Sequence, residues 1–138
     1  MPQIEWSPEL SMGIEKIDDQ HRRFVDLVNR LDKAVQEGDY QKAIKAATPG
    51  ILDYSKTHFA TEEDYMLRFD YSGYQEHKLE HAIFKEKIEA FLSDYKKDPS
   101  NPRKTATELH AFLTDWLREH LSQVDRHYVK CFKKNGLT

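Results

Sequence analysis

Apolar residues recur along the chain at intervals of three and four positions, the repeat of one face of an α-helix. This pattern predicts four helices, over residues 18–37, 40–69, 73–96 and 102–134. The first 17 residues carry two prolines and a glycine and predict an extended arm, which Ile4 and Trp6 attach to the body. Because most connections between the helices are short, the chain 1–138 is expected to form a single domain of the all-α class, an up-down-up-down four-helix bundle.

Capping residues refine the helix ends. Asp18 is expected to cap the first helix, and Gly38 to end it. Ser72 begins a capping box before the third helix, and Asn101 precedes the fourth. Pro49 falls inside the second helix, where it removes a backbone hydrogen bond, so we expect a kink or a short separate first segment there.

Composition narrows the possible partners. The 21 Lys and Arg residues do not exceed the 24 Asp and Glu residues, so nothing favours binding to nucleic acid. No apolar run approaches the roughly 18 residues of a membrane span, and the start of the chain does not resemble a secretion signal, so we expect a cytoplasmic protein. Cys131 is the only cysteine, which excludes an internal disulfide, and we expect it to be half-buried rather than nucleophilic.

Histidines stand out, because every predicted helix carries one on its apolar face. One such histidine is usually an ordinary core residue, but here three helices add a second possible ligand four or five positions away. The resulting candidate metal ligands are His21, His58, Glu62, His77, His81, His120 and Asp125. Residues four apart on an α-helix project about 40° apart, one turn along, so both can reach one ion. Burying them all unpaired would cost several kcal/mol, which favours a metal centre.

The number of ligands indicates two ions. Five histidines and two carboxylates exceed the needs of one tetrahedral zinc. Two octahedral ions offer twelve positions, of which five histidines, two bridging carboxylates and one bridging solvent oxygen fill eleven. A nitrogen-rich site of two redox-active ions with one open position suits iron and a small diatomic ligand.

The ligand pattern resembles that of the hemerythrin family, in its single-domain bacterial form. It consists of His21, His58-x-x-x-Glu62, His77-x-x-x-His81 and His120-x-x-x-x-Asp125, in this order. The pairs His58-Phe59 and Trp116-Leu117 and the positions of Tyr74 and Tyr128 are also similar, so the resemblance runs from about Trp6 to Tyr128. It implies a four-helix bundle that holds two non-haem iron ions, joined by a bridging oxo or hydroxo group, and binds O2 reversibly.

The resemblance also implies a role for each ligand. It assigns three histidines to one iron, two to the other and both carboxylates to bridges: His77, His81 and His120; His21 and His58; Glu62 and Asp125. The second iron then has the vacancy, where O2 would bind at the peroxide level with a proton from the bridging hydroxide. Four apolar residues are expected to line this pocket and exclude water, although each also has the spacing of a core residue: Phe24, Phe59, Trp116 and Leu121. Met66 is expected in the core.

The fourth helix poses a geometric problem. On a regular helix Asp125 would point about 140° away from His120, whereas His127 would lie only about 20° away. A π-type turn brings residues five apart nearly into line. We therefore predict a distortion within 120–125 that turns Asp125 inward and His127 outward. His110, about 80° from His120, is expected to be exposed.

The principal interpretation is a binding protein, not an enzyme, which stores, delivers or senses O2. A di-iron oxidase or peroxidase is the alternative, but ferritin-like oxidases use Glu-x-x-His pairs and this chain has none. Binding of nitric oxide or small anions and iron handling are variants that the sequence does not separate. A purely structural bundle would leave the buried histidines unexplained.

Overall fold

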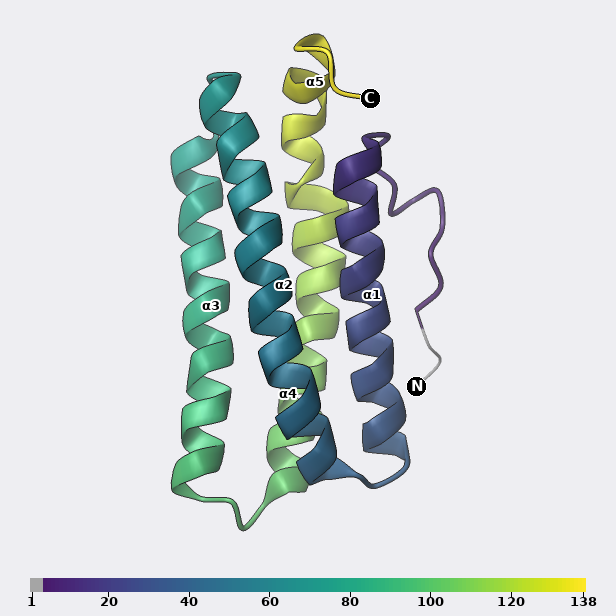
Figure 1. The fold of residues 1–138 in the computed structure, drawn as a ribbon, viewed down its shortest axis with the longest axis vertical. Helices are drawn as coiled ribbons and strands as arrows, with labels where there is room; N and C mark the ends of the chain where they lie inside the picture. Colours follow the sequence, from purple (N-terminus) through teal and green to yellow (C-terminus); the bar gives the residue numbers. More distant parts are fainter. Residues whose placement is uncertain (1–3) are drawn as a thin grey trace.

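The computed structural model describes residues 4–138, apart from the side chains of Ser122 and Gln123. The described residues form helices and no strand: α1 (Glu15–Gln36), α2 (Tyr40–Arg68), α3 (Tyr74–Lys97), α4 (Pro102–Trp116), η1 (Leu117–Val124) and α5 (Arg126–Lys134). Four long rods run side by side, and η1 and α5 continue the rod that α4 begins (Figure 1). The predicted four-helix bundle is confirmed. No helix of the described residues is long and apolar enough to cross a membrane.

The N-terminal arm runs along the outside of α1 (Figure 1). The side-chain amide of Asn29 holds both backbone groups of Ile4, accepting from its N–H at 2.8 Å and donating to its carbonyl at 2.7 Å. The guanidinium of Arg22 lies over the ring of Trp6, 4.8 Å from its centre. The arm is thus attached through Ile4 and Trp6 as predicted, while its residues 1–3 lie outside the described residues.

Two of the predicted helix ends are confirmed. The side-chain oxygen of Asn101 accepts from the N–H of Lys104 at 3.2 Å and caps α4. Gly38 adopts a φ of 78°, which lets the N–H of Asp39 reach the carbonyl of Ala34 at 2.9 Å and closes α1.

Two other predicted caps are wrong. The helix α1 begins three residues before Asp18, and the Asp18 carboxylate instead accepts from the backbone N–H of Met12 at 2.7 Å in the preceding loop. Ser72 is exposed and makes no cap hydrogen bond. Backbone atoms close that turn instead, since the N–H of Tyr74 donates to the carbonyl of Tyr71.

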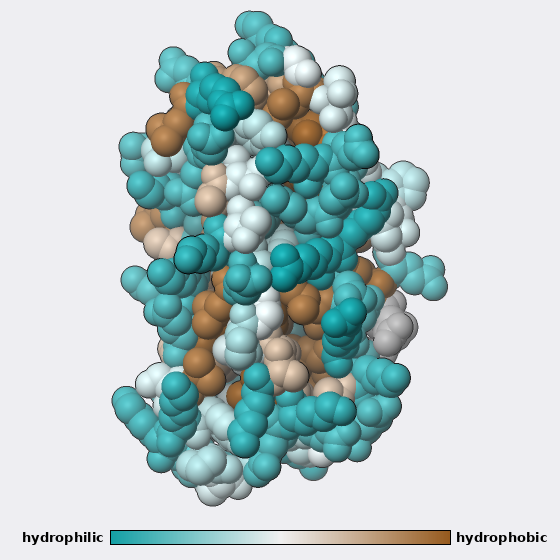
Figure 2. All heavy atoms as spheres, in the orientation of Figure 1, coloured by the Kyte–Doolittle hydropathy of each residue, from teal (hydrophilic) through white to brown (hydrophobic). Residues whose placement is uncertain are grey.

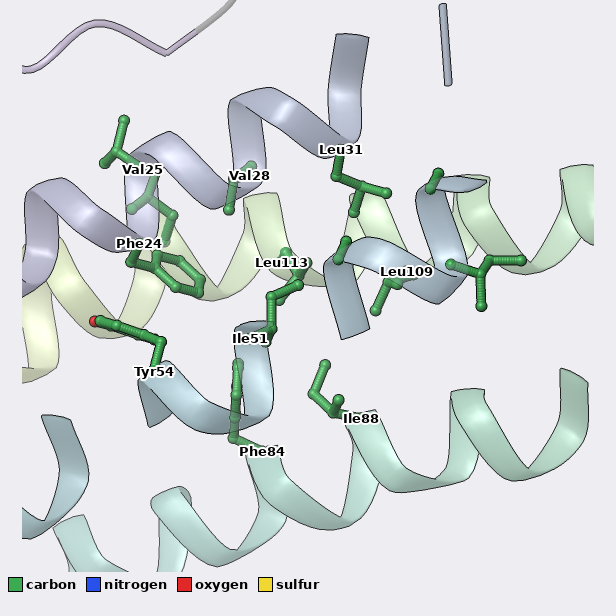
Figure 3. Packing of buried hydrophobic residues seen from close by; sticks show 14 of the residues in the cluster. Phe24, Val25, Val28, Leu31, Ile51, Tyr54, Phe84, Ile88, Leu109 and Leu113 are labelled. Atoms are coloured by element: carbon green, nitrogen blue, oxygen red, sulfur yellow. The ribbon is translucent and has the colours of Figure 1, made fainter. Parts of the chain in front are cut away.

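Two apolar clusters fill the bundle, one after the other along its axis. The large cluster joins α1, α2, α3 and α4 and includes Phe24, Val28, Leu31, Ile51, Phe84, Ile88, Leu109 and Leu113 (Figure 3). The small cluster lies toward α5 and consists of Met12, Ile14, Ile17, Met66, Tyr128 and Phe132. Met66 is therefore in the core, as predicted.

The helix α2 contributes to both clusters and runs unbroken through Pro49, so no separate first segment forms. Polar side chains cover most of one outer face, with apolar residues showing in strips (Figure 2).

Removing the Asn101 cap should destabilise the protein. We expect Asn101→Ala to lower the free energy of unfolding by about 1 kcal/mol, because one N–H at the start of α4 loses its partner. Ser72→Ala, the matched control, should leave it unchanged, because Ser72 caps nothing. Denaturant unfolding of both variants measures the difference, and equal losses would contradict this assignment.

Candidate metal centre

The seven predicted ligands lie in one layer between the two apolar clusters. They come from every rod of the bundle: His21 from α1, His58 and Glu62 from α2, His77 and His81 from α3, His120 from η1, and Asp125 from the residue after η1. None of them is more than 3% exposed. The sequence thus brings five imidazoles and two carboxylates into a space that water does not reach.

These residues form two groups that share both carboxylates. In the three-histidine group, one ligand atom from each of five residues lies within 4.8 Å of all the others: Glu62, His77, His81, His120 and Asp125. The two-histidine group meets the same condition with His21, His58, Glu62 and Asp125. Glu62 and Asp125 therefore lie between two neighbouring places where an ion could bind.

Asp125 lies against imidazoles on both sides. Its Oδ1 is 2.9 Å from Nε2 of His77 and 3.0 Å from Nε2 of His120. Its Oδ2 is 3.1 Å from Nε2 of His21. One carboxylate therefore contacts three rods of the bundle and both groups.

Glu62 also contacts imidazoles of both groups, through one oxygen. Its Oε1 is 2.9 Å from Nε2 of His58 and 3.3 Å from Nε2 of His81. Yet among the described residues, none of the four oxygens of Glu62 and Asp125 has a partner with hydrogen-bond geometry, and neither has Nε2 of His77, His81 or His120. Buried polar atoms normally find such partners. Lone pairs that converge without them are what a metal cation would satisfy, so the donor set fits a metal centre.

The electrostatics keep both carboxylates ionised. Burial by itself raises the pKa of Glu62, but the nearby imidazoles, His58 first, hold that pKa well below its usual range. Burial and the charge of Glu62 raise the pKa of Asp125, but the imidazoles of His120 and His21 outweigh them and lower it. In return, contacts with the two carboxylates overcome the effect of burial on His77 and raise its pKa to about 10.

Three of the histidines contact a polar side chain through Nδ1, the ring nitrogen that does not face the two carboxylates. Nδ1 of His81 forms a hydrogen bond with a carboxylate oxygen of Glu63 at 3.1 Å. Nδ1 of His120 lies 3.0 Å from a carboxylate oxygen of Glu80, a charge contact without hydrogen-bond geometry. The partner of His58 is the neutral amide oxygen of Gln20, at 2.6 Å. Such outer partners fix the ring and raise the basicity of the nitrogen that faces the metal. The charged partners belong to the three-histidine group only.

Aromatic rings pack directly on the imidazoles. Phe59 stacks on His81 with ring centres 3.8 Å apart, and the half-buried Trp116 stacks on His120 at 4.0 Å. A groove of about 690 Å³ between α2 and α3 opens beside Phe59, Glu63 and His81. Trp116 thus lies beside the three-histidine group, whereas Phe59 lies between the two groups, since its ring centre is also 5.9 Å from that of His58.

The other two predicted pocket residues, Phe24 and Leu121, are buried in the large cluster. Phe24 lies one helical turn after His21 and packs on Tyr54, with ring centres 5.2 Å apart. Phe24 thus lies on the side of the two-histidine group.

A π-helical segment brings Asp125 into the centre. The N–H of Asp125 donates to the carbonyl of His120 at 2.8 Å, which is an i→i+5 hydrogen bond. Asp125 is fully buried and His127 is exposed, so the predicted distortion is confirmed. The segment is longer than predicted and begins at Leu117.

His110 corrects the sequence prediction. It is buried, with Nε2 3.5 Å from a carboxylate oxygen of Asp32. The prediction measured its direction from His120, across the distorted turn. Measured from Leu109 and Leu113, on the same regular segment, His110 belongs to the buried stripe of α4. Cys131 is half-buried, as expected.

Sequence reasoning missed several residues that surround the ligands. Three of them directly precede or follow a ligand in the sequence: Gln20, Glu63 and Glu80. Each contacts a histidine on another helix, and the sequence does not indicate which one. Tyr54 could have been found, because it lies four residues before His58 on the same helix, and its ring stacks on that imidazole at 5.3 Å.

Comparisons with known proteins agree with this geometry. Residues 12–132 match the model of the family described as hemerythrin HHE cation binding domain. A bacteriohemerythrin of Clostridium acetobutylicum is 32% identical, over 90% of this chain and 97% of its own length. A bacteriohemerythrin of Pseudomonas aeruginosa is 33% identical, over 94% of this chain and 81% of its own length. A crystal structure of wild-type hemerythrin superposes with a TM-score of 0.76 at 26% identity, covering 95% of this chain and 98% of that one.

The stability of the metal-free protein should depend on the charge of His77. Its pKa is about 10 in the folded protein, against a usual value of 6.5. A group that binds its proton more tightly when folded stabilises the fold fully below the unfolded pKa and loses this effect as the pH rises through the folded one. We therefore expect the free energy of unfolding to fall between pH 6.5 and 10, and to fall less in His77→Gln. Denaturant unfolding across this range measures it, with His127→Gln as the exposed control; an identical slope in His77→Gln would contradict the assignment.

Proposed function

Because the chain belongs to the hemerythrin family, we propose that its seven buried ligands hold a pair of non-haem iron ions and that this pair binds O2 reversibly. The observation that supports the proposal is the pair of ligand groups with two shared carboxylates. The relatives that match nearly the whole chain carry the name bacteriohemerythrin, which agrees with it.

The two groups would leave one open position. The three-histidine group offers five protein donors to its ion, and the two-histidine group offers four. A bridging oxo or hydroxo group from solvent adds one donor to each. For two octahedral ions, the first is then complete and the second has room for one small ligand. The open position belongs to the two-histidine group.

Iron would supply the chemistry, since a pair of ferrous ions can lend two electrons to O2 and take them back on its release. The protein supplies the surroundings. Glu62 and Asp125 provide two negative charges in a buried layer, and the apolar clusters on either side exclude water. The carboxylates of Glu63 and Glu80 place negative charge behind His81 and His120, which would favour the ferric state of the ion that these histidines face. His58 has a neutral partner instead.

Oxidation of a small organic reductant is the second candidate function. The groove between α2 and α3 favours it, because its lining includes the ring of Phe59, which stacks on His81. The excess of imidazole over carboxylate ligands favours reversible binding, which we therefore place first.

Iron content tests the shared carboxylates. We expect two irons per chain in the wild type and loss of nearly all bound iron in Glu62→Ala and Asp125→Ala, because each carboxylate belongs to both groups. Elemental analysis of the purified proteins gives the ratio. His127→Ala is the matched control and should keep two irons, because that side chain is exposed. Saturation of the wild type at one ion per chain would overturn the two-ion arrangement.

Absorption spectroscopy tests the function itself. The anaerobically reduced iron protein should gain a visible charge-transfer band on exposure to O2 and lose it when O2 is removed, over repeated cycles. Irreversible oxidation, with consumption of an added reductant, would support the oxidase instead.

A further inference from the structure

The proposed function gives no role to the buried hydroxyls that lack a hydrogen-bond partner among the described residues, those of Thr48, Tyr54 and Tyr128, and Tyr54 is the one that stacks on a ligand of the two-histidine group. The side chain is 3% exposed, and its ring lies nearly parallel to that of His58, with an angle of 14° between them. Its hydroxyl oxygen has no hydrogen-bond partner among the described residues. A buried hydroxyl without a partner is destabilising, so a core that needed only the ring would be better served by phenylalanine.

The hydroxyl lies at the end of the large cluster that adjoins the two-histidine group. Figure 3 shows Tyr54 and Phe24 together at that end, with the oxygen of Tyr54 directed away from Ile51 and Leu113. Phe24 is one turn from His21 on α1, and Tyr54 is one turn from His58 on α2. The two aromatic residues therefore accompany the two histidines of this group.

The surrounding charges decide which role the hydroxyl can take. Burial, followed by the negative charges of Glu62 and Asp125, raises the pKa of Tyr54 well above its usual value. A phenol with even its usual pKa of about 10 is neutral at physiological pH, so the hydroxyl is available as a donor. A phenol donor bonds strongly to an anionic acceptor, particularly where water is excluded.

The other buried phenol near the centre lies on the opposite side. The ring of Tyr128 is 5.7 Å from that of His77, in the three-histidine group, and Tyr128 belongs to the small cluster. Of these two tyrosines, only Tyr54 lies beside the two-histidine group, which has four protein donors rather than five.

We propose that the hydroxyl of Tyr54 donates a hydrogen bond to the small anionic or oxygen-derived ligand that the two-histidine group binds, and so sets the affinity for that ligand. This inference rests on the proposed iron pair. It makes Tyr54 a specificity-determining residue that favours ligands carrying negative charge over neutral ones.

Azide binding to the diferric protein tests the proposal. We expect Tyr54→Phe to keep two irons and to bind azide at least about tenfold more weakly, the loss expected for one hydrogen bond to a charged acceptor. A titration followed by absorbance gives the dissociation constant. Tyr95→Phe is the matched control, since Tyr95 is buried in the large cluster on α3, and it should bind azide as the wild type does.

A second measurement needs no metal. Because the hydroxyl of Tyr54 has no partner, Tyr54→Phe should raise the Tm of the metal-free protein. A lowered Tm would show that the hydroxyl has a structural partner and would overturn the proposal.

Three further outcomes separate this proposal from the proposed function. Unchanged azide affinity in Tyr54→Phe would overturn the role of Tyr54 and leave the iron pair intact. A wild-type phenolate-to-iron absorption band that Tyr54→Phe lacks would also overturn it, because Tyr54 would then be a ligand and not a donor. Wild-type protein that loads no iron pair would overturn both proposals.

Discussion

Two ionised carboxylates buried at the centre of the bundle are the constraint on which the rest of the structure depends. Glu62 and Asp125 have no access to water, so their charges must be met by groups of the protein or by bound cations. Imidazoles from α1, α2, α3 and η1 meet them, which ties every rod of the bundle to the same layer. The two apolar clusters lie on either side of this layer.

The centre is not symmetrical about its carboxylates. Two of the histidines in one group receive a further negative charge from behind, whereas His58 in the other group receives a neutral amide. An ion in the first place is thus electrostatically better satisfied than its neighbour. The less satisfied place is also the one with fewer protein donors. Under the proposed function, both properties would direct an incoming ligand to the same side.

The sequence predicted the parts of this structure that follow from periodicity. The four rods and all the ligands except Asp125 follow from apolar stripes, and the closeness of His58 to Glu62 follows from one helical turn. Other features depend on contacts that periodicity does not contain. Ser72 fails as a cap because backbone atoms close the turn first, and Glu63 reaches His81 only through the packing of α2 on α3. His110 was misplaced because a direction cannot be carried across a turn that is not α-helical.

The π segment has a consequence for how sequences of this kind are compared. The stripe before it includes Leu109 and Leu113, and the stripe after it includes Tyr128 and Phe132, each with ordinary spacing. Between them the polypeptide carries in effect one more residue than an unbroken helix needs to join the two stripes. The segment is therefore equivalent to a single-residue insertion in a regular helix. The positions after it are numbered one higher than their place on the apolar stripe would require. Straightening the stretch into a regular helix with all its residues would rotate Asp125 and all of α5 by about 100°, whereas deleting one residue between His120 and Asp125 would leave the two four positions apart on one helix face. An alignment that counts this stretch as ordinary helix assigns the second carboxylate to the wrong position.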